Sequence, residues 1–228
     1  ATKDKYYKIT ENITVNKIID SDATQWYTKA GGLSGGFAGH LDGDGHTISG
    51  LYTFTTADNS YAGLFPMIES GSTVKNLGII NSSFSAKYVG GICGGIIKNN
   101  DQSVIIDTCY LDDTVIISAS HTAGGIVGRT AAAVSFSNSY TTSTVQADSK
   151  SGGIIGDKWD TATALIIKGC YTTCNKLYGQ VQGLSNDSAN NYLCDASNIE
   201  QYKGISAISK MPGLDWKNVY CLTTEFPA

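Results

Sequence analysis

The chain has 228 residues, only 16% of them charged, and a formal net charge of −4 at pH 7. It holds no basic cluster of the kind that binds nucleic acid and no apolar stretch long enough to span a bilayer. We therefore expect no nucleic-acid partner and no membrane insertion. The length fits a single domain, residues 1–228, with a substantial core.

The first 35 residues contain none of the phrases that recur later in the chain. We predict that residues 1–35 form an N-terminal cap, because a stacked array of strands must cover its open sheet edges to avoid polymerising. The chain begins at Ala1 rather than at Met. We therefore also expect it to be an excised piece of a larger secreted protein.

Two interleaved phrases dominate the middle of the chain. The first, a glycine followed by Leu or Ile, occupies residues 61–65, 89–94, 123–128 and 151–156, with a weaker copy at 183–184. The second occupies residues 74–79, 106–110, 136–140 and 167–171. Both return at intervals of roughly 30 residues, a period typical of stacked repeats. We therefore predict a solenoid with its coils in residues 36–194.

The repeat unit is rich in Gly, Ser, Thr, Ile, Val and Tyr, which favour strands and turns. Short apolar runs at 104–106, 115–117 and 165–167, bounded by turn residues, are expected to be buried strands. Two or three strands in each unit predict an all-β fold, a parallel β-helix of about five or six coils. One buried column of the core should contain Leu64, Ile92, Ile126 and Ile154.

Residues 195–228 depart from the repeat and are predicted to form a C-terminal cap. A capping box runs from Ser197 to Glu200, and apolar residues follow at three-residue spacing before Pro212. This pattern predicts a short C-terminal helix.

The six cysteines divide into two groups. Cys93, Cys109 and Cys170 occupy repeat positions where other coils carry apolar or small residues, so we expect them to be buried and unpaired. The other three lie near the C-terminal cap, where a disulfide remains open: Cys174, Cys194 and Cys221. No histidine lies near any of them in sequence, so we do not expect zinc.

Much of the chain resembles the GLUG-motif proteins. Residues 37–52 are similar to their opening coil, and residues 61–81, with Gly-Leu-Phe and Val-Lys-Asn-Leu-Gly-Ile, resemble the motif itself. The later phrases resemble successive coils, and residues 214–227 resemble the closing segment. The resemblance implies a right-handed β-helix in a secreted or cell-wall-attached bacterial protein. Such domains occur in adhesin-like proteins and beside the peptidase unit of IgA-cleaving metallopeptidases, and they share no catalytic residues.

Several carboxylates are candidates for catalytic or metal-binding groups. Asp42 and Asp44 flank a glycine, but the neighbouring positions do not fit a calcium loop, so a tight turn is expected. Polysaccharide cleavage would need two or three carboxylates on one face. The candidates for that chemistry are Asp42, Asp44, Asp112, Asp113, Asp157 and Asp160. We predict no catalytic residues, no metal and no cofactor.

Glycan binding is the most specific activity that the sequence suggests. Sugar rings stack on exposed aromatic faces, and amides and charged groups bind their hydroxyls. Tyr110, Tyr140 and Tyr171 share one repeat position and are expected to form a structural stack. The better candidates follow the first phrase in successive coils, where stacking should align them along one edge. The predicted ligand-binding residues are Asn100, Arg129, Asp157 and Trp159.

The leading hypothesis from the sequence is a non-enzymatic, extracellular module that adheres or acts as a spacer in a larger bacterial surface protein. The alternative is a carbohydrate-binding or polysaccharide-active β-helix. We expect a monomer that is secreted or attached to the cell wall. Its expected partner is a glycan or a protein of a host or cell surface.

Overall fold

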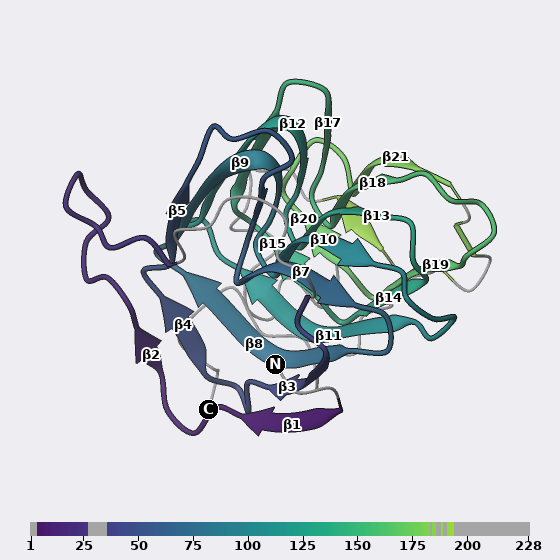
Figure 1. Cartoon of the computed structure of the whole chain (residues 1–228), viewed down its shortest axis with the longest axis horizontal. Coiled ribbons are helices and arrows are strands. Elements are labelled where there is room, and N and C mark those ends of the chain that lie inside the picture. The colour runs from purple at the N-terminus through teal and green to yellow at the C-terminus, as the bar shows by residue number, and fades with distance from the viewer. Residues whose placement is uncertain (1–3, 27–35, 183, 186–187, 189–190, 194–228) are drawn as a thin grey trace.

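The computed structural model describes residues 4–26, 36–182, 184–185, 188 and 191–193. These residues form an all-β solenoid of about five turns, without any helix (Figure 1). Each full turn passes through three parallel sheets, which we call sheets A, C and B in the order in which the chain visits them. The predicted all-β parallel β-helix is therefore confirmed.

The strands distribute over the three sheets as follows. Sheet A contains β1 (Lys5–Lys8), β2 (Ile13–Thr14), β3 (Gly39–Asp42), β4 (Thr47–Ser49), β8 (Thr73–Ile80), β11 (Val104–Leu111), β14 (Val134–Ser137), β15 (Tyr140–Thr141), β19 (Leu165–Lys168), β20 (Tyr171–Thr172) and β22 (Tyr192–Leu193). Sheet C contains β5 (Tyr52–Phe54), β6 (Tyr61–Ala62), β9 (Ser83–Gly90), β12 (Ile116–Gly124), β16 (Thr144–Ala147) and β17 (Lys150–Gly152). Sheet B contains β7 (Phe65–Glu69), β10 (Cys93–Ile97), β13 (Val127–Thr130), β18 (Ile155–Lys158) and β21 (Tyr178–Val181).

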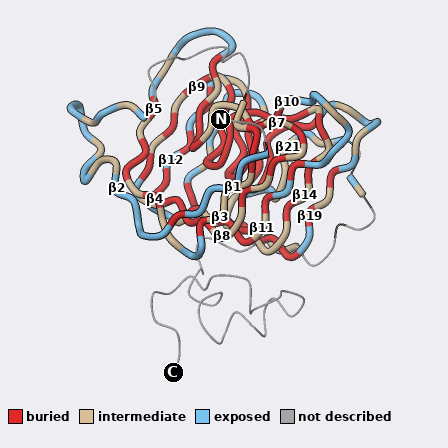
Figure 2. Tube along the Cα trace, turned by 60° about the horizontal axis from the view of Figure 1, so that its bottom comes forward, coloured by how far each residue is buried: buried red, intermediate tan, exposed pale blue. Residues whose placement is uncertain are grey.

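The strand register follows the repeat seen in the sequence. In sheet A, Cys109 of β11 lies opposite Leu77 of β8. The predicted core column is confirmed: Leu64, Ile92 and Ile126 are buried, as is Ile154. One apolar cluster extends from Ile9 through every coil to Cys170. Figure 2 shows the buried parts of the trace running through the coils, with exposed segments mainly at the turns.

The apolar runs form strands, but they are not buried throughout. Ile105, in the middle of the first run, is 45% exposed, and Ile116, in the second, is 52% exposed. Their neighbours on both sides are buried. Successive side chains of a strand point to opposite faces, so a run of three places its central residue outside. The expectation of fully buried runs was therefore wrong for these isoleucines.

The structure describes part of the predicted N-terminal cap and none of the predicted C-terminal cap. Within residues 1–35, β1 and β2 pair in parallel with β3 and β4, so they continue sheet A as its first row. Residues 27–35 lie outside the described residues. The same holds for residues 195–228, and hence for the predicted C-terminal helix.

The cysteine prediction is confirmed for the repeat positions. Cys93, Cys109 and Cys170 are fully buried and free. Burial raises the pKa of Cys109 and of Cys170 to about 12, so these thiols are not nucleophilic at neutral pH. Cys174 is free and partly buried. Cys194 and Cys221 lie outside the described residues.

The predicted tyrosine stack is also present. The ring centroids of Tyr110 and Tyr140 lie 5.1 Å apart, and those of Tyr140 and Tyr171 lie 4.6 Å apart, with nearly parallel planes. Tyr140 and Tyr171 are buried. The stack therefore belongs to the framework of the solenoid.

Candidate ligand-binding surface

The Gly-Gly-Ile phrase turns the chain from sheet C into sheet B with almost no space between the two strands. A Cβ atom on Gly128 would collide with the carbonyl oxygens of Gly94 and Val89, and one on Gly124 would collide with that of Val127. Only glycine allows backbones to approach this closely. We call this contact the glycine seam; it comprises Gly90, Gly94, Gly124, Gly128, Gly152 and Gly156.

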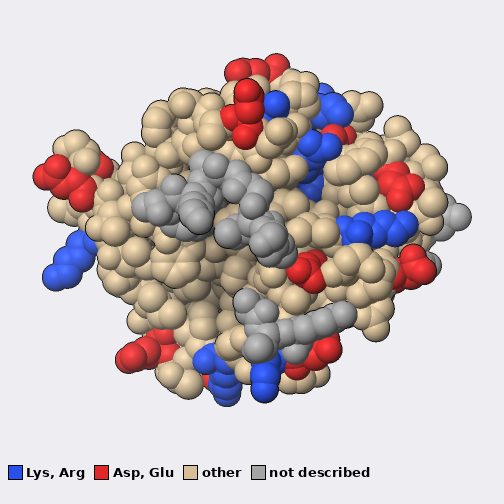
Figure 3. Space-filling view, viewed as in Figure 1, with Lys and Arg blue, Asp and Glu red and all other residues tan. Residues whose placement is uncertain are grey.

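The seam places two columns of side chains against each other. The column before the turn, in sheet C, contains Tyr61, Tyr88, Thr122 and Lys150. The column after the turn, in sheet B, contains Met67, Gly95, Arg129, Asp157 and Gln180. Figure 3 shows Lys and Arg atoms gathered near the top of the molecule, between β12 and β13. The seam cluster, as we define it, consists of Tyr61, Tyr88, Arg129, Lys150, Asp157 and Trp159.

Arg129 lies between two aromatic rings. Its Cζ atom is 4.2 Å from the ring centroid of Tyr88 and 4.2 Å from that of Trp159. Its Nε is buried and makes no hydrogen bond. Stacking on both faces compensates in part for this, since a guanidinium is attracted to aromatic faces. Arg129 thus fixes the orientation of both rings.

Asp157 is almost fully buried, so little of its carboxylate can contact a ligand. It lies opposite Arg129 in the strand register and is only 4% exposed. Lys150 Nζ lies 3.0 Å from its Oδ1, an ion pair rather than a well-aligned hydrogen bond. A buried carboxylate needs such a cation nearby. Its role here is to hold sheets B and C together, which corrects its placement on an open binding edge.

Trp159 is the exposed member of the cluster, with 43% of its surface accessible. It directly follows Lys158, which is fully buried and donates hydrogen bonds to the carbonyl oxygens of Asp160 and Thr163. Burial lowers the pKa of Lys158, and Asp160 opposes that effect. The Asp160 carboxylate accepts a hydrogen bond from the Ala162 N–H at 2.8 Å. Trp159 therefore lies on a turn that the hydrogen bonds of Lys158 and Asp160 hold in place.

Asn100 does not join the cluster. The residue opposite Arg129 in β10 is Gly95, and Asn100 lies beyond the end of that strand. Its side chain accepts a hydrogen bond from Gln102 N at 2.8 Å and donates one to Ser70 O at 3.4 Å. The turn after β10 is longer than the turn after β13, so an alignment at equal intervals misplaced this residue.

Sequence reasoning missed Tyr88 and Lys150. Both occupy the position two residues before the first glycine of the phrase, as Tyr61 does. That shared position was a usable signal. What the sequence did not reveal was the seam, which folds this column onto Arg129 and Asp157.

Three of the other candidate carboxylates, Asp42, Asp44 and Asp112, have local partners. Asp42 Oδ1 accepts a hydrogen bond from the Asp44 N–H at 2.9 Å, which confirms the predicted tight turn. Lys75 lies 3.1 Å from Asp42, and Lys8 lies 2.8 Å from Asp44. Asp112 accepts a hydrogen bond from Thr114 N at 3.1 Å. Within the part of the chain that the structure describes, no three metal-ligating side chains converge.

Trp26, another aromatic residue outside the repeat, is anchored to the framework. Its indole N–H donates a hydrogen bond to Leu64 O at 2.8 Å, which leaves the ring 40% exposed. Tyr27 lies outside the described residues.

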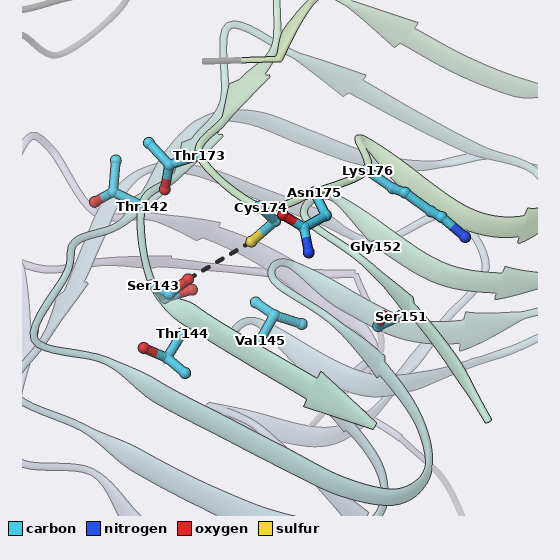
Figure 4. Close-up of a pocket in the computed structure, with 10 residues that line it drawn as sticks. All are labelled: Thr142, Ser143, Thr144, Val145, Ser151, Gly152, Thr173, Cys174, Asn175 and Lys176. Atoms are coloured by element: carbon cyan, nitrogen blue, oxygen red, sulfur yellow. Dashed lines mark hydrogen bonds between the residues drawn. The ribbon is translucent and has the colours of Figure 1, made fainter. Parts of the chain in front are cut away.

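A polar pocket, separate from the seam cluster, lies where the chain passes from β20 to β21 without a further strand in sheet C. This polar pocket of about 380 Å³ is lined by residues 142–145, 151–152 and 173–176 (Figure 4). Cys174 Sγ lies 3.6 Å from Ser143 O across it. Its walls are mostly Ser, Thr and Asn side chains, with Val145 and Lys176 beside them, and none of the lining residues is aromatic.

The comparisons with known proteins give few relatives. No protein-family model matches the chain. A "Putative Gly-rich membrane protein" of Evansella cellulosilytica is 25% identical over 95 residues, which cover 42% of this chain and 11% of that protein. This chain thus matches about a tenth of that relative. No helix in the described part of the chain has the length and apolar character of a membrane span.

One solved structure is similar in its overall course. It is the crystal structure of a "putative immunoglobulin A1 protease" from Bacteroides ovatus, with a TM-score of 0.49 and 21% identity. The superposition covers 84% of this chain and 69% of that one. The chain is a β-solenoid. The resemblance to GLUG-motif proteins remains a prediction from the sequence.

Proposed function

We propose that the chain is a non-enzymatic module of a larger extracellular bacterial protein, where it adheres to a surface or acts as a spacer. The observation that carries this proposal is the state of its carboxylates. Asp42, Asp44 and Asp157 are paired with lysines, and Asp112 accepts hydrogen bonds within its own turn. A general acid or base must exchange a proton with the substrate, and each of these carboxylates already has a lysine or a backbone N–H as its partner.

The continuous core supports the mechanical part of the proposal. A single apolar cluster joins all the coils, and successive coils are hydrogen-bonded along three sheets. Such a body transmits force from one end to the other without a hinge in its middle, as a spacer requires.

Two assays on the full chain test this proposal. The first measures reducing ends released from plant and host polysaccharides, and we expect none above the buffer control. Release above that control, reproduced with independent preparations of the protein, would refute the non-enzymatic proposal. The second measures the retention of protein-coated beads on immobilised glycans and on host-cell monolayers. Retention on either supports adhesion, and its absence on both leaves the spacer role alone.

Carbohydrate binding at the seam cluster is the second candidate function, favoured by the exposed ring of Trp159 braced by Arg129. Arg129 stacks against that ring at 4.2 Å, and its positive charge favours an anionic sugar. Lys98 adds a second, partly exposed cation, 3.7 Å from Asp160 in the turn that carries Trp159. A uronate or sialic acid unit could stack on the indole with its carboxylate toward these residues.

The test is titration with oligogalacturonate and sialyllactose. Trp159→Ala should weaken binding at least tenfold, about 1.4 kcal/mol, with little change in melting temperature because the ring is partly exposed. Trp26→Ala is the matched control, since it removes a similarly exposed indole outside the cluster, and it should leave the affinity unchanged. Equal effects of the two substitutions, or none from Trp159→Ala, would rule out this site.

A further inference from the structure

A groove of about 480 Å³ lies on sheet A over its first three rows, β1, β3 and β8. Val74 of β8 is buried in the core, so its neighbours Thr73 and Lys75 face outward. The strand register places Tyr6, His40 and Thr73 in one outward column. Lys8, Asp42 and Lys75 form the next.

Tyr6 supplies an aromatic platform at one side of the groove. Its ring stacks on that of His40, with centroids 4.5 Å apart and planes inclined by 23°. The residue is nevertheless 82% exposed. The ring is therefore held by His40 on one face and open to solvent on the other. An exposed aromatic face of this kind matches the apolar C–H face of a pyranose ring.

The other side of the groove offers charged groups that are already oriented. Asp42 lies 3.1 Å from Lys75 and accepts a hydrogen bond from Asn76 at 3.0 Å, while Lys8 lies 2.8 Å from Asp44. Ammonium groups donate and carboxylates accept, so the groove presents both halves of what a hydroxyl needs. Because two lysines are balanced by two carboxylates, the groove favours neither an anion nor a cation.

We propose that this groove, which we call the Tyr6 groove, binds a hexopyranose unit of a neutral polysaccharide. The sugar ring stacks on Tyr6, and its hydroxyls bind Lys8, Asp42 and Lys75. The volume suits one or two sugar units, within the range of small-ligand sites. The groove lies on sheet A, whereas the seam cluster lies on sheets B and C, so the proposal does not depend on binding at Trp159.

The experiment uses the full chain on a printed array of neutral and uronate-containing oligosaccharides, followed by calorimetric titration with the strongest ligand. We expect a neutral oligosaccharide to be that ligand. Tyr6→Ala should weaken its binding at least tenfold. Tyr6→Phe keeps the ring and should retain the affinity within about twofold. Trp159→Ala should leave it unchanged.

Three results would overturn the proposal. They are the absence of any neutral ligand on the array, an affinity that survives Tyr6→Ala, and a loss of neutral-ligand binding with Trp159→Ala but not with Tyr6→Ala. Tyr6 is so exposed that its replacement should not unfold the protein, and the melting temperature of each variant verifies this.

Discussion

Thr108 adopts a backbone conformation that its side chain disfavours. Its φ is +53°, in the left-handed region, where a β-branched residue is strained. The equivalent positions of other coils carry Asn76, Asn138 and Gly169, also with positive φ, and asparagine and glycine tolerate this region. The bend at this column recurs in successive coils of sheet A, so the fold imposes it on Thr108.

We therefore expect Thr108→Asn to stabilise the protein by about 1 kcal/mol. Urea unfolding at neutral pH measures this change. The control is Thr144→Asn on β16, an exposed strand position without positive φ, where asparagine should be neutral or slightly destabilising. A loss of stability at position 108 would show that packing of the threonine side chain outweighs its backbone strain.

Asp42 makes the stability of the first coils depend on pH. Burial acts to raise its pKa, but hydrogen bonds from Asn76 and the Asp44 N–H, together with Lys75, outweigh that effect and hold the pKa below its ordinary value of 3.8. A carboxyl with a lowered pKa contributes stability above its unfolded-state pKa and loses that contribution as the pH falls through the folded-state value.

Asp42→Asn should accordingly destabilise the protein at pH 7 by about 0.5–1 kcal/mol. The difference from the wild type should shrink as the pH falls from about 4 toward 2, where the wild-type carboxyl is protonated. Urea unfolding at pH 7, pH 4 and pH 2 measures the difference across this window, with the exposed Asp113→Asn as control. A difference that stays constant with pH would mean that the carboxylate charge has no part in it.

At the scale of the element, the turn between sheets C and B depends on glycine for space. A methyl group on Gly128 would meet main-chain oxygens, which cannot move without disrupting the coil. One on Gly95 would meet the ring of Tyr61 at 2.8 Å and the sulfur of Met67 at 3.0 Å, both at the ends of movable side chains. Neither glycine has a positive φ, so the two positions differ in the contacts that a methyl group would make.

Gly128→Ala should therefore destabilise by about 2–3 kcal/mol or more, and Gly95→Ala by about 1 kcal/mol or less. Thermal unfolding of the two variants gives the comparison. If they were equally stable, the backbone at the seam would be able to separate, and the close contact could not be what fixes the seam cluster.

The core column offers a second test at this scale. Ile126 is fully buried between Ile92 and Ile154, whose main chains it joins by hydrogen bonds of 3.0 Å. Ile126→Ala should leave a cavity and destabilise by about 2–5 kcal/mol. Ile116→Ala is the control, because that side chain is 52% exposed, and it should lower the unfolding free energy by less than about 1 kcal/mol. Similar losses for both variants would contradict the strand register.

At the scale of the whole molecule, the sequence predicted the features that follow the repeat period, such as the buried core column. It missed the contacts that depend on the length of individual turns and on how the coils approach each other. Ile126 and its equivalents could be assigned to the core because the same glycines flank each of them. Trp159 could be placed near Arg129 because each lies within three residues of the last glycine of its phrase, before the turns begin to differ in length. Asn100 could not be placed, since it lies further along a turn whose length differs between coils. The contact of Tyr88 with Arg129 depends on which backbones meet at the glycine seam, and the glycine phrase alone does not specify that pairing.

The stacked architecture also predicts how stability varies along the molecule. Each central coil is hydrogen-bonded to two neighbours, whereas β1 pairs with β3 alone among the described residues, so opening should become easier toward β1. Amide hydrogen exchange followed by mass spectrometry should find β9, β12 and β13 the most protected and β1, whose residues are all exposed, among the least. Ile126→Ala should accelerate exchange in β12, which precedes it in the same coil, and in β9 of the coil before, more than in β1. Equal protection from β1 to β13 would instead indicate that the coils unfold together as one cooperative unit. In that case, force applied at one end could not open the terminal coil alone.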